Sequence, residues 1–185
     1  MGRAEGRAPA ANADMHDPAT LGTMTGRRAT VILAGLTLLV LMLSLPGSLR
    51  DALERGGIYL FSRAFLEDIP KRLTGPGRFR FVVQPVIATL LGIRSGRADA
   101  RAGRPPYLYG VLFHRGLRGE LVRTGFETVL NLVLMGILLD AIFQWVILGV
   151  SHPGAALLVG PVLIVAPYSL ARALSNRLGR LRGRE

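Results

Sequence analysis

The sequence predicts an all-α integral membrane protein with three transmembrane helices, and two observations support this class. Half of the 185 residues are hydrophobic and the mean hydropathy is +0.37, which is unusual for a small soluble domain. The apolar residues are also concentrated in three long stretches that carry almost no charge. A helix of about 20 apolar residues is long enough to cross a hydrocarbon layer of roughly 30 Å.

The first spanning helix is predicted over residues 29–49, which are 21 residues without a charge. A cleaved signal peptide is the alternative, but the sequence SLPGS at the far end lacks a small-x-small cleavage site, so we expect an uncleaved anchor. Residues 1–28, rich in Gly, Ala and polar side chains, show no apolar periodicity, and we expect them to be disordered.

Residues 50–80 form a basic amphipathic region. Its apolar residues recur at steps of three and four, which predicts an amphipathic helix that ends at Pro70. These residues are Ile58, Phe61, Phe65 and Ile69. Such a helix suits either the membrane interface or the core of a small cytosolic domain.

Residues 81–93 are apolar but too short to be a typical spanning helix, and arginines flank them on both sides. We therefore expect a half-inserted or re-entrant helix. Residues 94–127 are predicted to be a basic cytoplasmic loop followed by an amphipathic helix from Tyr107 to Phe126.

The last two stretches predict a transmembrane hairpin over residues 128–171. Residues 128–151 contain one charge, Asp140, and residues 153–171 contain none. Because only Ser151, His152 and Pro153 form the connection, the two helices are expected to be antiparallel neighbours. Residues 172–185 form a basic cytoplasmic tail.

The distribution of basic residues predicts the orientation. Of the 23 Lys and Arg residues, four lie in residues 1–28, 14 in residues 50–127 and five in residues 172–185, and the hairpin turn contains none. Since basic residues accumulate on the cytoplasmic side, we expect the C-terminus and residues 50–127 to be cytoplasmic. Three crossings then place the N-terminus outside. If residues 81–93 also crossed, the N-terminus would lie inside, and the seven basic residues of residues 50–80 would lie outside, which the same rule disfavours. The dominance of Arg over Lys resembles a GC-rich coding bias, which suggests a bacterial protein of the inner membrane.

The net charge of +11 admits an anionic partner, but no nucleic-acid-binding motif accompanies it, so we expect none of that kind. Anionic membrane lipid is the other possibility, with headgroups attracted by the basic region. The alternative is that the arginines only set topology. The candidate headgroup contacts are Arg94, Arg97, Arg101, Arg104, Arg115 and Arg118.

Asp140 is the most informative single residue, because a charge inside a membrane costs at least about 2.5–3.5 kcal/mol unless it is paired. Gln144 and Gly136 share its helix face, whereas Asn131 belongs to another face. One interpretation is a proton, cation or ligand site formed by these polar residues. The other is a structural residue that fixes helix association, which we favour because no second intramembrane acid or base completes a relay.

Small residues predict where the spanning helices pack. Gly136 permits close approach by a partner helix, and Ala156 and Gly160 have small-xxx-small spacing. Catalytic and metal-binding motifs are absent from the sequence, which contains no Cys and three widely separated His residues. We therefore expect no enzyme, no cofactor and no metal.

The chain from about residue 65 to 178 resembles a family of small bacterial integral membrane proteins to which no activity is assigned. The resemblance is carried by GPGRFRFVVQPVIATLLGIRSGRADARAGRPPYLYGVLF, LLDAIFQWVIL and HPGAALLVGPVLIVAPYSLARALSNR. It implies a similar hairpin architecture and implies no activity.

The leading functional hypothesis is a non-enzymatic accessory or interaction protein that packs against a membrane complex or against itself. One alternative is a small oligomeric transporter or channel that uses Asp140. The other is a protein that binds anionic lipid of the inner leaflet.

Overall fold

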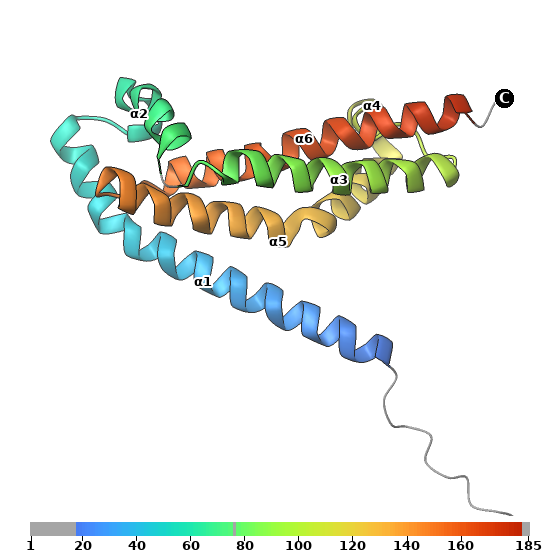
Figure 1. The fold of residues 1–185 in the computed structure, drawn as a ribbon, viewed down its shortest axis with the longest axis horizontal. Helices are drawn as coiled ribbons and strands as arrows, with labels where there is room; N and C mark the ends of the chain where they lie inside the picture. Colours follow the sequence, from blue (N-terminus) through green and yellow to red (C-terminus); the bar gives the residue numbers. More distant parts are fainter. Residues whose placement is uncertain (1–17, 76, 183–185) are drawn as a thin grey trace, which may run out of the picture.

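The computed structural model describes residues 18–75 and 77–182 (Figure 1). These residues form six α-helices, a short 3-10 helix and no strand, so the predicted all-α class is confirmed. The helices are α1 (Pro18–Arg55), η1 (Tyr59–Phe61), α2 (Arg63–Thr74), α3 (Arg80–Arg101), α4 (Tyr107–Phe113), α5 (Arg115–Leu148) and α6 (Pro153–Arg182).

Three helical segments are long and apolar enough to cross a membrane, namely Gly26–Arg55, Arg115–Leu148 and Pro153–Leu181. They coincide with the three predicted transmembrane helices, so the chain has an all-α membrane fold. Each helix extends beyond its uncharged stretch because the flanking residues include many Arg, Leu and Ala, which are good helix formers.

Helices α5 and α6 form an antiparallel hairpin. Gly149 ends α5 with a φ of 74°, in the left-handed region that favours glycine, and Pro153 begins α6, where a missing N–H removes no helical hydrogen bond. The helices approach closely at Gly136 and Gly160, because a Cβ on Gly160 would lie 2.7 Å from the backbone nitrogen of Ile137. We call the end of the molecule at the hairpin turn the turn end, and the end where α6 finishes the tail end.

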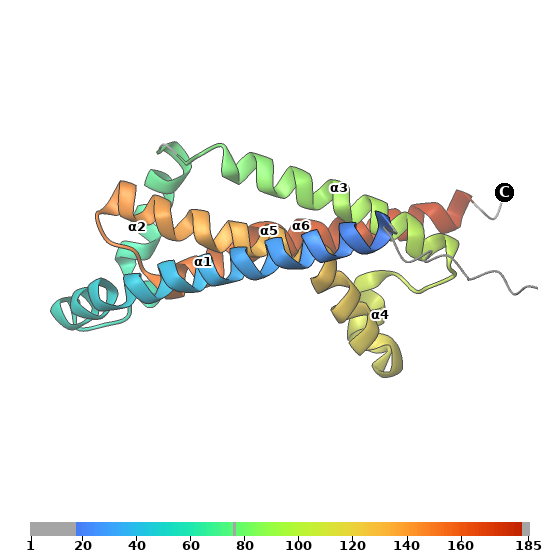
Figure 2. The same cartoon turned by 90° about the horizontal axis from the view of Figure 1, so that it is seen from below.

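Helix α3 packs along α6 in the most extensive helix contact of the described residues. Gly92 lies against the backbone of Tyr168, and Gly96 against that of Arg172, so the two helices run in the same direction. Small residues four positions apart let the two backbones approach closely. Helix α3 therefore extends from the turn end to the tail end (Figures 1 and 2).

The course of α3 differs from the expected half-inserted element at residues 81–93. These residues begin a continuous helix of 22 residues, about 33 Å long, which does not return to its starting end as a re-entrant segment would. Residues 50–80 consequently lie at the turn end and residues 102–114 at the tail end. This arrangement does not support the expectation that all of residues 50–127 share one side, because α3 separates the two parts.

Helix α1 packs on α5 through a narrow strip. The hydroxyl of Thr37 donates to the carbonyl oxygen of Leu134 at 3.3 Å, and Leu41 and Ser44 are buried. Toward the tail end, α1 diverges from the other long helices (Figure 1). Most of its apolar surface is therefore exposed.

The start of α1 also differs from expectation. Residues 18–28 are helical, although we expected residues 1–28 to be disordered; residues 1–17 lie outside the described residues. Because α1 starts toward the tail end and α6 finishes there (Figures 1 and 2), the two described termini lie at the same end. Three crossings had predicted opposite ends, and the added passage of α3 accounts for the difference.

The two short helices lie at opposite ends of the molecule, α2 at the turn end and α4 at the tail end (Figure 2). Helix α2 continues through Pro70 to Thr74, so Pro70 does not end it. The amphipathic segment expected from Tyr107 to Phe126 is divided at His114, whose backbone is not helical (φ −110°, ψ 88°). Its second part continues into α5, since no helix-breaking residue separates them.

Candidate functional site

Asp140 lies at the centre of a buried ionic cluster near the turn end. Its side chain is fully buried, and Nη1 of Arg72 donates to its two oxygens at 3.1 and 3.3 Å. Nη2 of Arg80, the first residue of α3, also donates to it. Two cations from segments distant in sequence therefore pair with the carboxylate that the sequence predicted within the membrane.

Gln144 connects Asp140 to the hairpin turn. Its amide nitrogen donates to Oδ2 of Asp140 at 2.6 Å, and its carbonyl oxygen accepts from the backbone N–H of His152 at 2.9 Å. The spacing of four residues puts both side chains on one helix face, as the sequence suggested. Asn131 is exposed and takes no part. We call Asp140, Arg72, Arg80 and Gln144 the turn-end cluster.

Tyr59 forms a second layer around this cluster. Its hydroxyl donates to Asp68 at 2.8 Å and accepts from Nη2 of Arg72 at 3.4 Å. Burial raises the pKa of Tyr59 to about 12. Burial alone would raise the pKa of Asp68, but hydrogen bonds from Lys71 and Tyr59 lower it overall. Tyr59 is therefore a hydroxyl donor and Asp68 a carboxylate acceptor at neutral pH.

The ring of His152 stacks on that of Tyr59, with centroids 3.8 Å apart. Its Nδ1 lies 3.4 Å from the hydroxyl oxygen of Ser48, and its Nε2 lies 3.8 Å from Asp51. Burial lowers the pKa of His152. The ring is therefore neutral at pH 7. Its contacts with Ser48 and Asp51 connect the end of α1 to the hairpin turn without adding a charge.

The turn-end cluster contains one carboxylate and two guanidinium groups, so it carries a net positive charge. Cation–π contacts stabilise part of this charge, since the guanidinium carbon of Arg80 lies 4.7 Å from the ring centre of Phe81 and 5.7 Å from that of Phe143. Asp140 accepts three charged or amide donors at once. Such a carboxylate holds α2, α3 and α5 together.

A polar cavity of about 350 Å³ lies beside this cluster at the turn end. It contains both acids and bases, and Lys71 pairs with Asp68 at 2.7 Å while Arg55 pairs with Asp51 at 2.8 Å. Because these charges neutralise one another, the cavity does not select one sign of ligand.

A second ionic cluster occupies the tail end. Arg172 of α6 donates to Asp99 of α3 through Nε at 2.6 Å and Nη2 at 3.1 Å, and through Nη1 to the hydroxyl oxygen of Tyr168 at 3.0 Å. Its guanidinium carbon also lies 4.5 Å from the ring centre of Tyr107. We call Asp99, Arg172, Tyr168 and Tyr107 the tail-end cluster.

Sequence reasoning did not find the partners in either cluster. An intramembrane acid requires a cation, but nothing local shows that Arg72 and Arg80 supply it rather than the other basic residues. The sequence places Asp99 in a predicted basic loop and Arg172 in a basic tail that indicates topology. Their pairing could not be predicted, because it depends on α3 lying parallel to α6.

The remaining candidate residues fall into two groups. Gly136 and Gly160 lie against each other between α5 and α6, and Ala156 is fully buried in the same core. The six arginines proposed to contact headgroups are all exposed. Arg104 differs from the others because it pairs with Glu120 at 2.7 Å and also lies 3.7 Å from Asp99 of the tail-end cluster.

Within residues 18–75 and 77–182, no group of three His, Asp or Glu side chains is placed to hold a metal ion. The turn-end and tail-end clusters consist of ion pairs and hydrogen bonds between helices. Comparison with known proteins finds no matching family model, no similar curated protein and no similar solved structure.

Proposed function

We propose that this chain is a non-enzymatic accessory or interaction protein that packs in the membrane against a larger complex or a second copy of itself. The observation that carries this proposal is the outward face of α1. A Cβ at Gly35 would meet no other atom within 4 Å, whereas one at Gly92, Gly96, Gly136 or Gly160 would clash with a neighbouring helix.

An unpartnered glycine within a spanning helix needs a reason, because glycine destabilises a helix interior by roughly 0.5–1 kcal/mol relative to alanine. Close approach by another helix is the usual reason in membranes. Large apolar residues surround Gly35 on the same exposed side of α1. They are Val31, Ile32, Leu38, Leu39 and Met42.

The contacts of Asp140 support binding rather than transport. A transporter that used this carboxylate would have to break its pairs with Arg72 and Arg80 in every cycle. In the structure these pairs, together with the bond from Gln144, connect α2, α3 and α5. A residue that connects α2, α3 and α5 is suited to stabilising the bundle on which α1 packs.

We further infer that the tail end faces the cytoplasm of a bacterial inner membrane. The positive-inside rule supports this orientation, because the tail end carries exposed arginines at the start of α1, on α3 and on α5. They are Arg27, Arg28, Arg97, Arg101, Arg115 and Arg118. The turn end carries fewer exposed basic residues, namely Arg50, Arg55, Arg63, Lys71 and Arg78.

The test is purification of the full chain in a gentle detergent, with crosslinking in intact membranes before extraction. We expect the wild-type protein to be recovered as an oligomer or with a membrane partner. The Gly35→Ile variant should lose most of this association, because its added side chain prevents close approach without touching the rest of its own chain.

Gly119→Ile is the matched control, because a Cβ at Gly119 also meets nothing within 4 Å but lies in the charged start of α5. It should keep the association. A wild-type protein that is always a lone monomer would contradict the proposal, as would equal behaviour of the two variants.

A further inference from the structure

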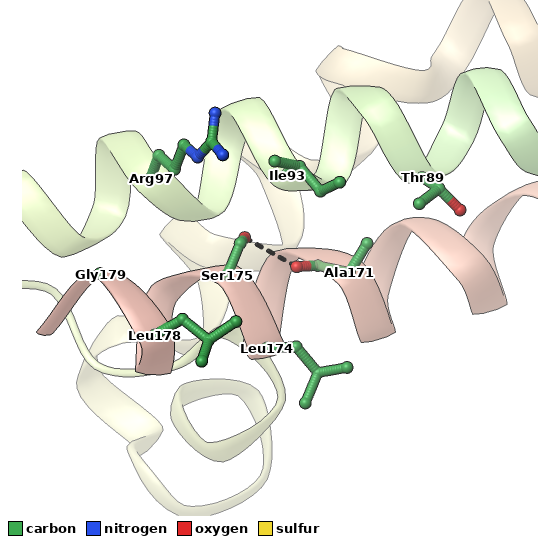
Figure 3. Close-up of a pocket in the computed structure, with 8 residues that line it drawn as sticks. All are labelled: Thr89, Ile93, Arg97, Ala171, Leu174, Ser175, Leu178 and Gly179. Atoms are coloured by element: carbon green, nitrogen blue, oxygen red, sulfur yellow. Dashed lines mark hydrogen bonds between the residues drawn. The ribbon is translucent and has the colours of Figure 1, made fainter. Parts of the chain in front are cut away.

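A groove of about 380 Å³ follows the seam between α3 and α6 (Figure 3). Thr89, Ile93 and Arg97 line it at successive turns of α3. On the α6 side, Leu174 and Leu178 lie along it and both are exposed. The groove therefore opens to the surroundings of the helices.

The groove exists because small residues follow one another along α6. Ala171, Ser175 and Gly179 are spaced by four residues, and none carries a side chain that fills the seam. The hydroxyl of Ser175 donates to the carbonyl oxygen of Ala171 at 2.7 Å, as Figure 3 shows. The Ser175 hydroxyl is thus hydrogen-bonded within its own helix, and the groove beside it is mainly apolar.

The charge of the groove is concentrated at its tail end. Arg97 lines that end on the α3 side, and Gly179 lines it on the α6 side (Figure 3). Arg94 and Arg101 lie one turn to either side on α3. All three arginines are exposed, and none forms an ion pair within the described part of the chain. Their guanidinium groups are available to an anion from outside.

We infer that this groove binds one anionic phospholipid, with the headgroup phosphate at Arg97 and part of an acyl chain along Ile93 and Thr89. The order of chemistry along the groove matches that of the lipid, since cationic groups lie at the tail end and apolar walls extend toward the middle of the bundle. From Arg97 to Thr89 is eight residues, or about 12 Å of helix. The volume lies within the range of small-molecule sites, roughly 300–1,000 Å³.

This assignment is independent of the proposed accessory function, since it uses α3 and α6 and not α1. It differs from general attraction to a charged surface in one respect. A single lipid in a groove depends on Arg97 and on the seam beside it, whereas surface attraction depends on all exposed arginines about equally.

The experiment is native mass spectrometry of the full-length protein in detergent, titrated with phosphatidylglycerol or with zwitterionic phosphatidylcholine. We expect one tightly bound phosphatidylglycerol per chain and weaker binding of phosphatidylcholine. Arg97→Gln should weaken phosphatidylglycerol binding about fivefold, the factor for one guanidinium near an anionic lipid. Thr89→Trp should weaken binding of the same lipid by filling the apolar part of the groove.

Arg118→Gln is the matched control, since Arg118 is an exposed tail-end arginine outside the groove. It should bind phosphatidylglycerol as the wild type does. Equal binding of the two lipids would overturn the assignment, and so would equal losses in the Arg97→Gln and Arg118→Gln variants. A dimer that excludes lipid from the wild-type protein would assign the groove to a second copy instead. Arg97→Gln changes an exposed side chain, so the test does not depend on whether Thr89→Trp folds.

Discussion

The turn-end and tail-end clusters both join α3 to the hairpin through buried charges, but they differ in composition. At the turn end, one carboxylate on α5 lies between two guanidinium groups from α2 and from the start of α3. At the tail end, one carboxylate on α3 meets the Nε and Nη2 donors of one buried guanidinium on α6, and tyrosines complete the site. A second guanidinium, that of the partly exposed Arg104, lies 3.7 Å from the same carboxylate.

The difference shows how each cluster responds to the loss of one charge. Removal of the carboxylate at the turn end leaves two buried cations facing each other. At the tail end it leaves one buried cation, Arg172, which keeps a tyrosine hydroxyl and an aromatic face. Arg104 is partly exposed and keeps its pair with Glu120. Breaking a buried pair is expensive mainly because of the charge left behind, so the turn end should be the more sensitive.

The largest expected effect is that of Asp140→Ala, which should lower the free energy of unfolding by about 3–5 kcal/mol. The reason is the pair of uncompensated guanidinium groups of Arg72 and Arg80. Thermal or denaturant unfolding of the purified protein in detergent measures the change. Asn131→Ala, on an exposed position of the same helix, should change stability little.

A smaller loss, about 1.5–3 kcal/mol, is expected for Asp99→Ala at the tail end, since one charge-assisted hydrogen-bonded pair is removed. The same unfolding measurement applies. A double-mutant cycle with Arg172→Met separates the pair from the other contacts of Arg172. If Asp99→Ala proved as destabilising as Asp140→Ala, the proposed contrast between the clusters would be wrong.

The close packing of α3 on α6 is tested by Gly96→Ala on α3. Its added methyl group would clash with the backbone of Arg172, so we expect a loss of about 1–3 kcal/mol from overpacking. Gly119→Ala, where a Cβ meets nothing within 4 Å, should be neutral or stabilising by up to about 1 kcal/mol. Similar results for both variants would mean that α3 does not pack closely on α6.

The smallest effect is a pH dependence confined to the turn end. Because burial lowers the pKa of folded His152, the unfolded chain takes up a proton first as the pH falls through about 6.5. Stability should therefore decrease below that pH and level off below the folded pKa. In the His152→Gln variant, the free energy of unfolding should depend less on pH between pH 5 and 7 than in the wild type.

The candidate site shows how far sequence reasoning extends. Asp140 and Gln144 share a face because helical spacing alone requires it, and a buried carboxylate requires a partner. The partners Arg72 and Arg80 lie 68 and 60 residues away in sequence. Their choice depends on where α2 and the start of α3 pack, which no local pattern specifies.

The sequence by itself determined the all-α membrane class, the three apolar helices and the hairpin, because hydropathy acts locally and a short turn allows only an antiparallel pair. The tertiary structure decided the course of α3, the position of residues 50–80 and the partners of both acids. The physical reason is that the apolar stretch of α3 is too short to predict from hydropathy whether the helix runs the length of the bundle. It lies beside α6 because Gly92 and Gly96 allow close contact with residues far along the chain, and because Arg80 and Asp99 find opposite charges at its two ends.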